Sequence, residues 1–289
     1  MLTPDILAAA VVNGLTTGAV YALIAVGLTL VYGVLHIVNF AHGAILAAAM
    51  FAAYFAFQYG VDPYVALAPL AVVFFGLGYA AQRLVIGPAS HGEDRNVLLV
   101  TLGLSIVIEN LLLAAFSSDT RSINTTYGFA TIRLGPLFVS LPKAIGFGVS
   151  CAVGMTLWAL LNYTDIGKAI RAVAKERMGA RLVGIDPPHV FAVTFGLSAA
   201  CLAIAACVLL PVYYVDPRVG EAYVLIAFTI VVLGGMGSIA GAMVGGLLIG
   251  VVESLSGLLL GDSLGQLGIY LIFILVLLLR PRGLFGATA

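Results

Sequence analysis

Long apolar segments dominate this sequence and restrict what the chain can fold into. Nine blocks of roughly 17 to 28 residues contain almost no charged side chains, and a helix of about that length crosses the hydrocarbon core of a bilayer. The blocks cover 6–33, 38–57, 63–81, 97–116, 144–161, 189–211, 223–238, 240–260 and 264–280. Only 9% of the 289 residues are charged and 62% are hydrophobic, whereas about 25% are charged in an ordinary soluble domain. The sequence therefore predicts an all-α, polytopic integral membrane protein with eight or nine transmembrane helices.

The last third of the chain leaves the number of spans open. Blocks 223–238 and 240–260 are separated only by a glycine cluster. They form either two spans or one span and one re-entrant segment, in which case one helix or more is broken within the membrane. Under both alternatives we expect residues 1–289 to form a single transmembrane domain.

The distribution of basic residues predicts the orientation. Nine of the thirteen Lys and Arg residues lie in three segments that alternate crossings place on one side of the membrane, and the positive-inside rule makes that side the cytoplasm. We therefore expect a cytoplasmic C-terminus, an external N-terminus and an external loop over 117–143, with a small hairpin around Gly135-Pro136. The formal net charge is zero, so nothing indicates nucleic acid as a partner. The nine residues are Arg83, Arg95, Lys168, Arg171, Lys175, Arg177, Arg181, Arg280 and Arg282.

The longest charged passage, over about 163–188, has the pattern of a short amphipathic helix. Apolar residues Ile166, Ala169, Ile170 and Val173 share one helical face, and basic residues Lys168, Arg171 and Lys175 share another. We expect Gly179 and Gly184 to interrupt the helix and Pro187-Pro188 to stop it before the next span. Such a helix either rests on anionic lipid headgroups or docks into another protein. The apolar turn "RLVGI" (181–185) favours docking, because a helix lying on lipid has no need of a projecting turn.

Glycines recur at regular intervals in the passage "GGMGSIAGAMVGGLLIG" (234–250). Gly237, Gly241 and Gly245 fall on one helical stripe, and Gly246 with Gly250 adds a neighbouring pair. Stripes of small residues let two helices approach closely in lipid, where van der Waals contact drives association. We expect close helix packing here, and the alternative is a path-lining surface on which missing side chains leave room for a solute.

Polar residues in "HIVNFAHG" (36–43) stand between two apolar blocks. Polar groups at membrane depth are costly and face a cavity, the bundle interior or one another. Three interpretations are open: a solvated cytoplasmic turn, a hydrogen-bonded knot between helices, or a lining of the substrate path. If the segment lines a path, Asn39 and His42 are the candidate residues.

Two carboxylates lie inside apolar blocks. Glu109, followed by Asn110, sits past the middle of block 97–116, and Glu253 lies near the predicted outer boundary of block 240–260. A carboxylate at the centre of a span costs roughly 2.5–3.5 kcal/mol on insertion scales, so each needs a partner. Each one either makes a helix–helix hydrogen bond or takes part in passage, and we include Glu109 and Asn110 among the candidate path residues.

Several passages resemble one family of membrane proteins. "GLTLVYGVLHIVNFAHG", "TLGLSIVIENLL", "GKAIRAVAKERMGARLVGID", "VVLGGMGSIAGAMVGGLLIGVVES" and "LLLRPRGLFG" occur in order from about residue 13 to 286. They are similar to the permease subunits of bacterial ABC importers for branched-chain amino acids, and most similar to the first of the two permeases. The family more often has a neutral amide at the position of Glu109. This departure means that the resemblance alone does not predict which substrate this chain prefers.

The resemblance implies partners and a coupling role. The partners would be a second permease subunit, two cytoplasmic ATPase subunits and an external substrate-binding protein, in the plasma membrane of a bacterium. The passage 165–186 would then be the coupling segment that an ATPase cleft receives. Its candidate residues are Gly167, Arg171, Lys175, Arg177, Gly179, Leu182, Gly184 and Ile185.

The chain has no phosphate-binding loop of its own. That loop needs G-x-x-x-x-G-K-[ST], but Gly167-Lys168 is followed by Ala169 and is preceded five positions earlier by Asn162. We expect ATP to be used by partner subunits, no cofactor or metal to be held by this chain, and no enzymatic activity of its own.

The sequence leaves three candidate functions for this chain. The first is the permease of an ATP-driven importer for branched-chain amino acids, or for urea, short amides or other small solutes. The second is an ion-coupled secondary transporter that uses Glu109 and His42 as proton carriers. The third, an intramembrane hydrolase built on Ser238 and His42, lacks any sequence context that would activate the serine.

Overall fold

The computed structural model describes residues 4–90, 94–135, 137–261, 264–280 and 283–285, and most of them are helical. Arg282 and Pro136, which the orientation and hairpin predictions used, lie outside the described residues. The helices are α1 (Pro4–Leu35), α2 (His42–Gln58), α3 (Pro63–Ala80), the π-helix η1 (Ala81–Ile86), α4 (Gly87–Ser90), α5 (Asp94–Phe116), α6 (Leu141–Tyr163), α7 (Asp165–Lys175), α8 (Arg177–Leu182), α9 (Pro187–Leu209), α10 (Val219–Gly234), α11 (Ile239–Leu260) and α12 (Gly265–Leu279).

Each of the nine apolar blocks overlaps one apolar helix, although α10 begins four residues before its block and ends four residues before the end of that block. Six helices within the described part of the chain are long and apolar enough to cross a membrane, the second of them running through α3, η1 and α4. Three shorter apolar helices, α2, α10 and α12, account for the other blocks. The prediction of an all-α, polytopic membrane protein is confirmed.

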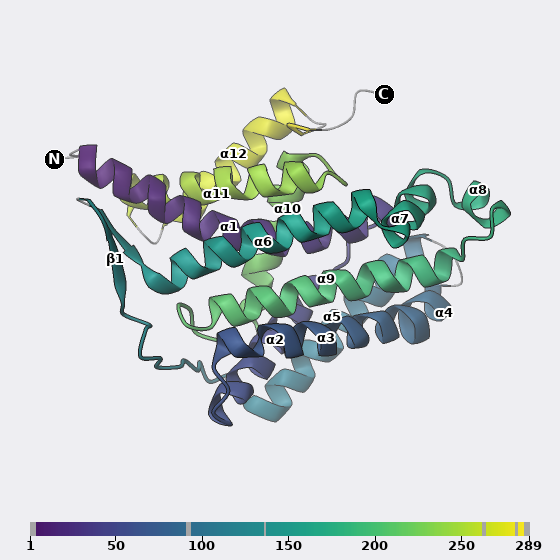
Figure 1. The fold of residues 1–289 in the computed structure, drawn as a ribbon, viewed down its shortest axis with the longest axis horizontal. Coiled ribbons are helices and arrows are strands. Elements are labelled where there is room, and N and C mark those ends of the chain that lie inside the picture. The colour runs from purple at the N-terminus through teal and green to yellow at the C-terminus, as the bar shows by residue number, and fades with distance from the viewer. Residues whose placement is uncertain (1–3, 91–93, 136, 262–263, 281–282, 286–289) are drawn as a thin grey trace.

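The two short strands and the helices α7 and α8 lie at opposite ends of the molecule. The first residues of α1 and the strands β1 (Thr131–Leu134) and β2 (Leu137–Ser140) lie at the left in Figure 1, and α7 and α8 lie at the right. We name these the hairpin end and the α7–α8 end. The strands pair antiparallel, with Ile132 opposite Val139, so the predicted hairpin is present.

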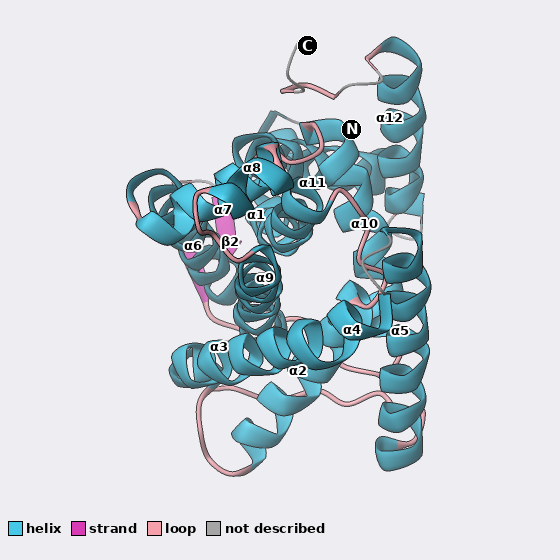
Figure 2. Cartoon of the chain, turned by 90° about the vertical axis from the view of Figure 1, so that its right-hand side faces the viewer, coloured by secondary structure: helices cyan, strands magenta, loops and turns pink. Residues whose placement is uncertain are grey.

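The centre of the bundle is formed by α1 and α9. Figure 2 views both almost along their axes, with α5 and α12 crossing the view at its right edge. The apolar window of α1 is 89% buried, whereas that of α5 is 11% buried. Because lipid tails solvate apolar side chains as well as a protein core does, the exposed face of α5 needs no cover to be stable in a bilayer.

Glycines bring α11 against two neighbours. A β-carbon placed on Gly246 would lie 2.5 Å from Ala22 Cα, and one on Gly250 would overlap the backbone of Gly14 and Gly18. On another side, Gly241 meets the backbone of Gly234 on α10. Two helix pairs therefore pack backbone to backbone, which only residues without side chains permit.

Gly237 does not belong to the helical stripe that the sequence predicts. It precedes α11, which begins at Ile239, and its φ of 89° lies in the region that favours glycine. It lies against Gly33 of α1, where a β-carbon on Gly237 would be 3.4 Å from Gly33 Cα. The expectation that Gly237, Gly241 and Gly245 lie on one helix is therefore wrong for Gly237, because the chain turns there between α10 and α11.

Helices α2 and α10 begin inside the bundle. α1 ends at Leu35, and the chain then runs back until His42, the first residue of α2, meets Ile24 in the middle of α1. Gly43 at this start of α2 touches the backbone of Gly220 in the first turn of α10. Irregular backbone is permitted at membrane depth where it is buried in protein, and Ile37, Asn39 and Ala41 of segment 36–41 are buried, whereas His36 and Phe40 are exposed.

Candidate functional site: the coupling segment and the hairpin-end cavity

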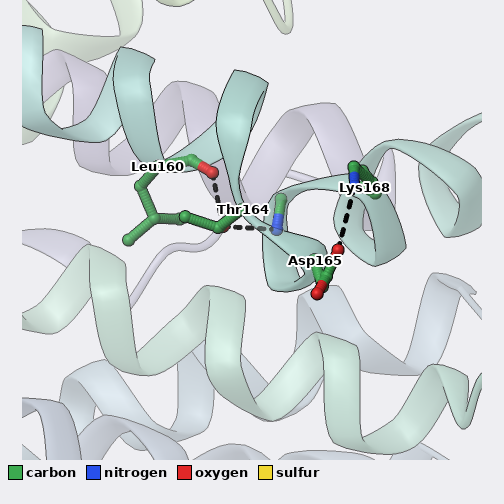
Figure 3. A network of polar contacts seen from close by, with 5 residues as sticks. Leu160, Thr164, Asp165 and Lys168 are labelled. Atoms are coloured by element: carbon green, nitrogen blue, oxygen red, sulfur yellow. Dashed lines mark hydrogen bonds and ion pairs between the residues drawn. The ribbon is translucent and has the colours of Figure 1, made fainter.

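The candidate coupling segment, residues 163–188, begins at a tight corner between α6 and α7. Thr164 Oγ1 donates to the carbonyl of Leu160 at 2.6 Å and accepts from the N–H of Gly167 at 3.1 Å, which caps α7 (Figure 3). A β-carbon on Gly167 would overlap the backbone of Leu160 and Leu161. Glycine at 167 therefore lets α7 fold back closely on the end of α6.

Helix α7 is amphipathic, as predicted, but the membership of its faces differs at one position. Ile170 and Val173 are buried, whereas Arg171 and Lys175 are exposed. Ile166, expected on the apolar face, is exposed because it lies in the first turn, at the outside of the corner. Lys168 bonds Asp165 at 2.9 Å in the same turn and holds the pKa of that carboxyl below its usual value.

The helix breaks at Glu176 rather than at Gly179. Glu176 has an extended backbone (φ −156°), and its carboxylate accepts the N–H of Met178 at 3.2 Å, which starts α8. Gly179 lies within α8 and does not interrupt it. Gly184 ends the segment with a φ of 87°, as predicted, but Pro187 and Pro188 begin α9 rather than stop the preceding helix.

Arg177 differs from the other candidate coupling residues because its side chain points inward. Its guanidinium donates to the carbonyl of Leu35 at 2.9 Å and lies 5.3 Å from the ring centroid of Phe191. Leu35 is the last residue of α1, where unpaired carbonyls favour a cation. Arg177 thus ties α8 to the ends of α1 and α9.

The tip of the segment exposes apolar side chains. Leu182 is 82% exposed, Val183 is 76% exposed and Met178 is 64% exposed, while Ile185 is partly buried. The tip stands at the far right of Figure 1, beyond the ends of the long helices. A projecting apolar turn flanked by the exposed Arg171, Lys175 and Arg181 can insert into a cleft of another protein.

The two pairs of candidate path residues lie apart in the fold. Asn39 and His42 are buried in or beside segment 36–41, where Asn39 Oδ1 accepts the N–H of Ala41 at 3.0 Å. His42 Nε2 donates to the carbonyl of Ile24 at 2.9 Å, so His42 links α2 to α1 and is not solvated. This geometry matches the interpretation of a hydrogen-bonded knot.

Glu109 and Asn110 lie on α5 and interact only with their own helix in the described structure. Glu109 is half-buried and accepts from Ser105 Oγ at 3.3 Å, and Asn110 is exposed and donates to the carbonyl of Ile106 at 2.8 Å. The structure therefore does not bring them together with Asn39 and His42.

A cavity of about 620 Å³ opens near the hairpin end, among α1, α6, α10, α11, α12 and the loop before α10. Its walls include charges of both signs, tyrosines and apolar groups, among them Tyr21, Lys143, Arg218, Tyr223, Ile226 and Glu253. The sequence singled out Glu253 but not the others, because they come from four separate elements, α1, α6, the loop before α10 and α10. No group of three or more His, Cys, Asp or Glu side chains in the described residues could hold a metal ion.

Comparison with known proteins identifies permease proteins of transport systems as relatives of this chain. Residues 10–279 match the family described as "Branched-chain amino acid transport system / permease component". The chain is 35% identical to the high-affinity branched-chain amino acid transport system permease protein BraD of Pseudomonas aeruginosa, covering 95% of this chain and 94% of that protein. It is 32% identical to LivH of Escherichia coli over the same shares, and 28% identical to the ribose import permease protein RbsC of Bacillus subtilis.

Among solved structures, PsaBC from Streptococcus pneumoniae in complex with Fab aligns with a TM-score of 0.50 at 15% identity, covering 93% of this chain and 91% of that one. This likeness concerns the fold alone. The match over residues 10–279 and the identity to BraD and LivH decide the family. With its apolar helices and its α7–α8 segment, the chain belongs to the permease components of branched-chain amino acid transport systems.

Proposed function

We propose that this chain is one of two permease subunits in an ATP-driven importer for branched-chain amino acids. BraD and LivH are named as permeases for these solutes, and the chain spans 94% of each. The α7–α8 end would face the cytoplasm and receive the ATPase subunits, and the hairpin end would face an external substrate-binding protein. The single observation that carries the coupling role is the exposed apolar tip at Leu182 and Val183.

The exposed apolar side chains of this segment are not distributed as they would be on a helix that only rests on lipid. A lipid-lying helix presents its apolar face continuously along one side, but the buried side of α7 is already used against the bundle, where Ile170 and Val173 pack. Apart from Ile166 in the first turn of α7, the exposed large apolar side chains of residues 165–186 lie on α8 and on the turn after it. Support for a protein partner therefore comes from where the exposed apolar groups lie and not from the basic charge alone.

An ion-coupled mechanism finds less support. A proton path needs titratable groups that can exchange protons with one another or with water, and Glu109 and His42 lie on separate elements with separate partners. His42 is fully buried and bonded to a backbone carbonyl. An ATP-driven mechanism does not require either residue to gain or lose a proton during transport.

The test is uptake into proteoliposomes that contain this chain with its second permease, its ATPases and its binding protein. We expect labelled leucine, isoleucine or valine to accumulate only with ATP, and to accumulate equally when proton and sodium gradients are abolished. Urea and ribose serve as competing substrates, since RbsC carries the name of a ribose permease. Uptake driven by an ion gradient without ATP would refute the proposal. ATP-driven uptake of urea or ribose, but of no branched-chain amino acid, would keep the importer and change the assigned substrate to that solute.

A further inference from the structure

The hairpin-end cavity has the size and the lining of a binding site for a small solute. Its volume of about 620 Å³ falls within the roughly 300–1,000 Å³ of ordinary ligand sites. Two carboxylates, Glu253 and Asp216, and two cations, Lys143 and Arg218, line the same space as Tyr21 and Ile226. Asp216 Oδ1 already accepts the N–H of Arg218 at 2.8 Å, which leaves Glu253 as the carboxylate on the helical wall. A solute with both charges and an aliphatic side chain would find a complementary group for each of its parts.

Glu253 retains capacity to bind a cation. Its side chain is half-buried on α11, and the one hydrogen bond it makes within the described residues comes from Tyr21 Oη at 3.2 Å. A carboxylate has about four lone-pair sites, and a carboxylate within a span is costly unless it serves a function or is fully paired. The positions left open on Glu253 suit an ammonium group that enters the cavity.

The wall that carries Glu253 is rigid. Gly250, one turn earlier on α11, packs on the backbone of Gly14 and Gly18, and Ser254 Oγ donates to the carbonyl of Ala10 at 2.7 Å. Both contacts fix α11 to α1, which also carries Tyr21. A charged group held between two closely packed helices keeps its position relative to a ligand.

The opposite charge gathers where α10 begins. Arg218 immediately precedes Val219, the first residue of α10, and both line the cavity. The N-terminus of a helix carries a partial positive charge, and half-helices in transporters direct such ends at anionic groups of the substrate. Lys143 of α6, whose Nζ donates to Asn13 Oδ1 at 2.7 Å, also lines the cavity, and its charge acts on Glu253.

We propose that the hairpin-end cavity binds one zwitterionic amino acid with an aliphatic side chain during its passage. The α-ammonium would bind Glu253 and Tyr21, the α-carboxylate would bind Arg218 and the first turn of α10, and the side chain would lie against Val219 and Ile226. This inference rests on the proposed function and adds to it a site of recognition inside the permease. Of these residues, only Glu253 is one for which the sequence raised a role in passage.

The experiment compares leucine uptake with ATP hydrolysis in the complete reconstituted complex. Glu253→Gln keeps the size of the side chain and an acceptor for Tyr21 but removes the charge, so we expect leucine uptake to fall at least tenfold. ATP hydrolysis stimulated by the leucine-loaded binding protein should stay within twofold of wild type, because the α7–α8 end is untouched. Ala222→Trp, which fills the cavity and leaves Glu253 in place, should lower uptake as strongly.

The matched control is Glu221→Gln, because Glu221 is an exposed carboxylate in the first turn of α10 that does not line the cavity. Its uptake should equal that of wild type. Wild-type uptake in both Glu253→Gln and Ala222→Trp would overturn the inference while leaving the proposed function intact. Loss of ATP-driven leucine uptake in the wild-type complex would instead refute the proposed function itself.

Discussion

Replacing Gly250 with leucine should destabilise the protein by more than about 3 kcal/mol, above the usual 1–3 kcal/mol for overpacking. A β-carbon at this position overlaps the carbonyl oxygen of Gly14 and the Cα of Gly18. Both are backbone atoms, so no side chain can rotate away and α1 must separate from α11. Since α1 is the most buried of the long helices, its displacement would affect the whole bundle.

The measurement for Gly250→Leu is thermal or denaturant unfolding of the purified protein in detergent. Gly148→Leu is the matched control, because Gly148 is an exposed helical glycine on α6 and a β-carbon there meets nothing within 4 Å. We expect the control to unfold within about 0.5 kcal/mol of wild type, as surface substitutions usually do. Equal stability of the two variants would show that α1 and α11 do not pack backbone to backbone.

The second large effect concerns the tip of the coupling segment. The double substitution Leu182→Asp with Val183→Asp places two charges on an apolar turn that is 82% and 76% exposed at these positions. Because the side chains touch little of this chain, folding and membrane insertion should be unaffected. If the turn fills a cleft in an ATPase subunit, the loss of two apolar anchors costs at least about 2 kcal/mol of binding.

A loss of that size lowers the association constant between this chain and the ATPase subunit by about 30-fold. We expect ATP-driven leucine uptake to fall by at least the same factor. The conservative pair Leu182→Met with Val183→Ile keeps the surface apolar and should transport normally. Amounts of each variant in the membrane are measured by immunoblotting. Normal uptake by the Asp pair at equal abundance would count against docking through this turn.

The sequence predicted those parts of the fold that follow directly from lipid being the solvent, namely the positions of the apolar helices. Every apolar block became a helix, because an unpaired backbone is not tolerated in hydrocarbon. The hairpin and the amphipathic character of α7 also followed from local patterns. The break between α7 and α8 did not, because the carboxylate of Glu176 caps α8, a role that glutamate seldom takes, while Gly179 fits within a helix.

Features that depend on contacts between distant segments could not be predicted. Nothing local indicates that the chain returns from Leu35 to the level of Ile24 before α2 starts, so the buried bond of His42 was one of three open interpretations. Arg171 and Arg177 have the same side chain and lie close in sequence, yet one is exposed and the other caps α1. The cavity lining comes from helices far apart in the chain, which periodicity within one segment cannot reveal.

Site-specific photo-cross-linking from position 182 in the complete complex tests the central claim most directly. A photoreactive residue in place of Leu182 should form an adduct with an ATPase subunit, whereas one in place of Leu271, an exposed apolar residue on α12, should not. Cross-links from position 182 to lipid alone, in a complex that still hydrolyses ATP and imports leucine, would contradict the account.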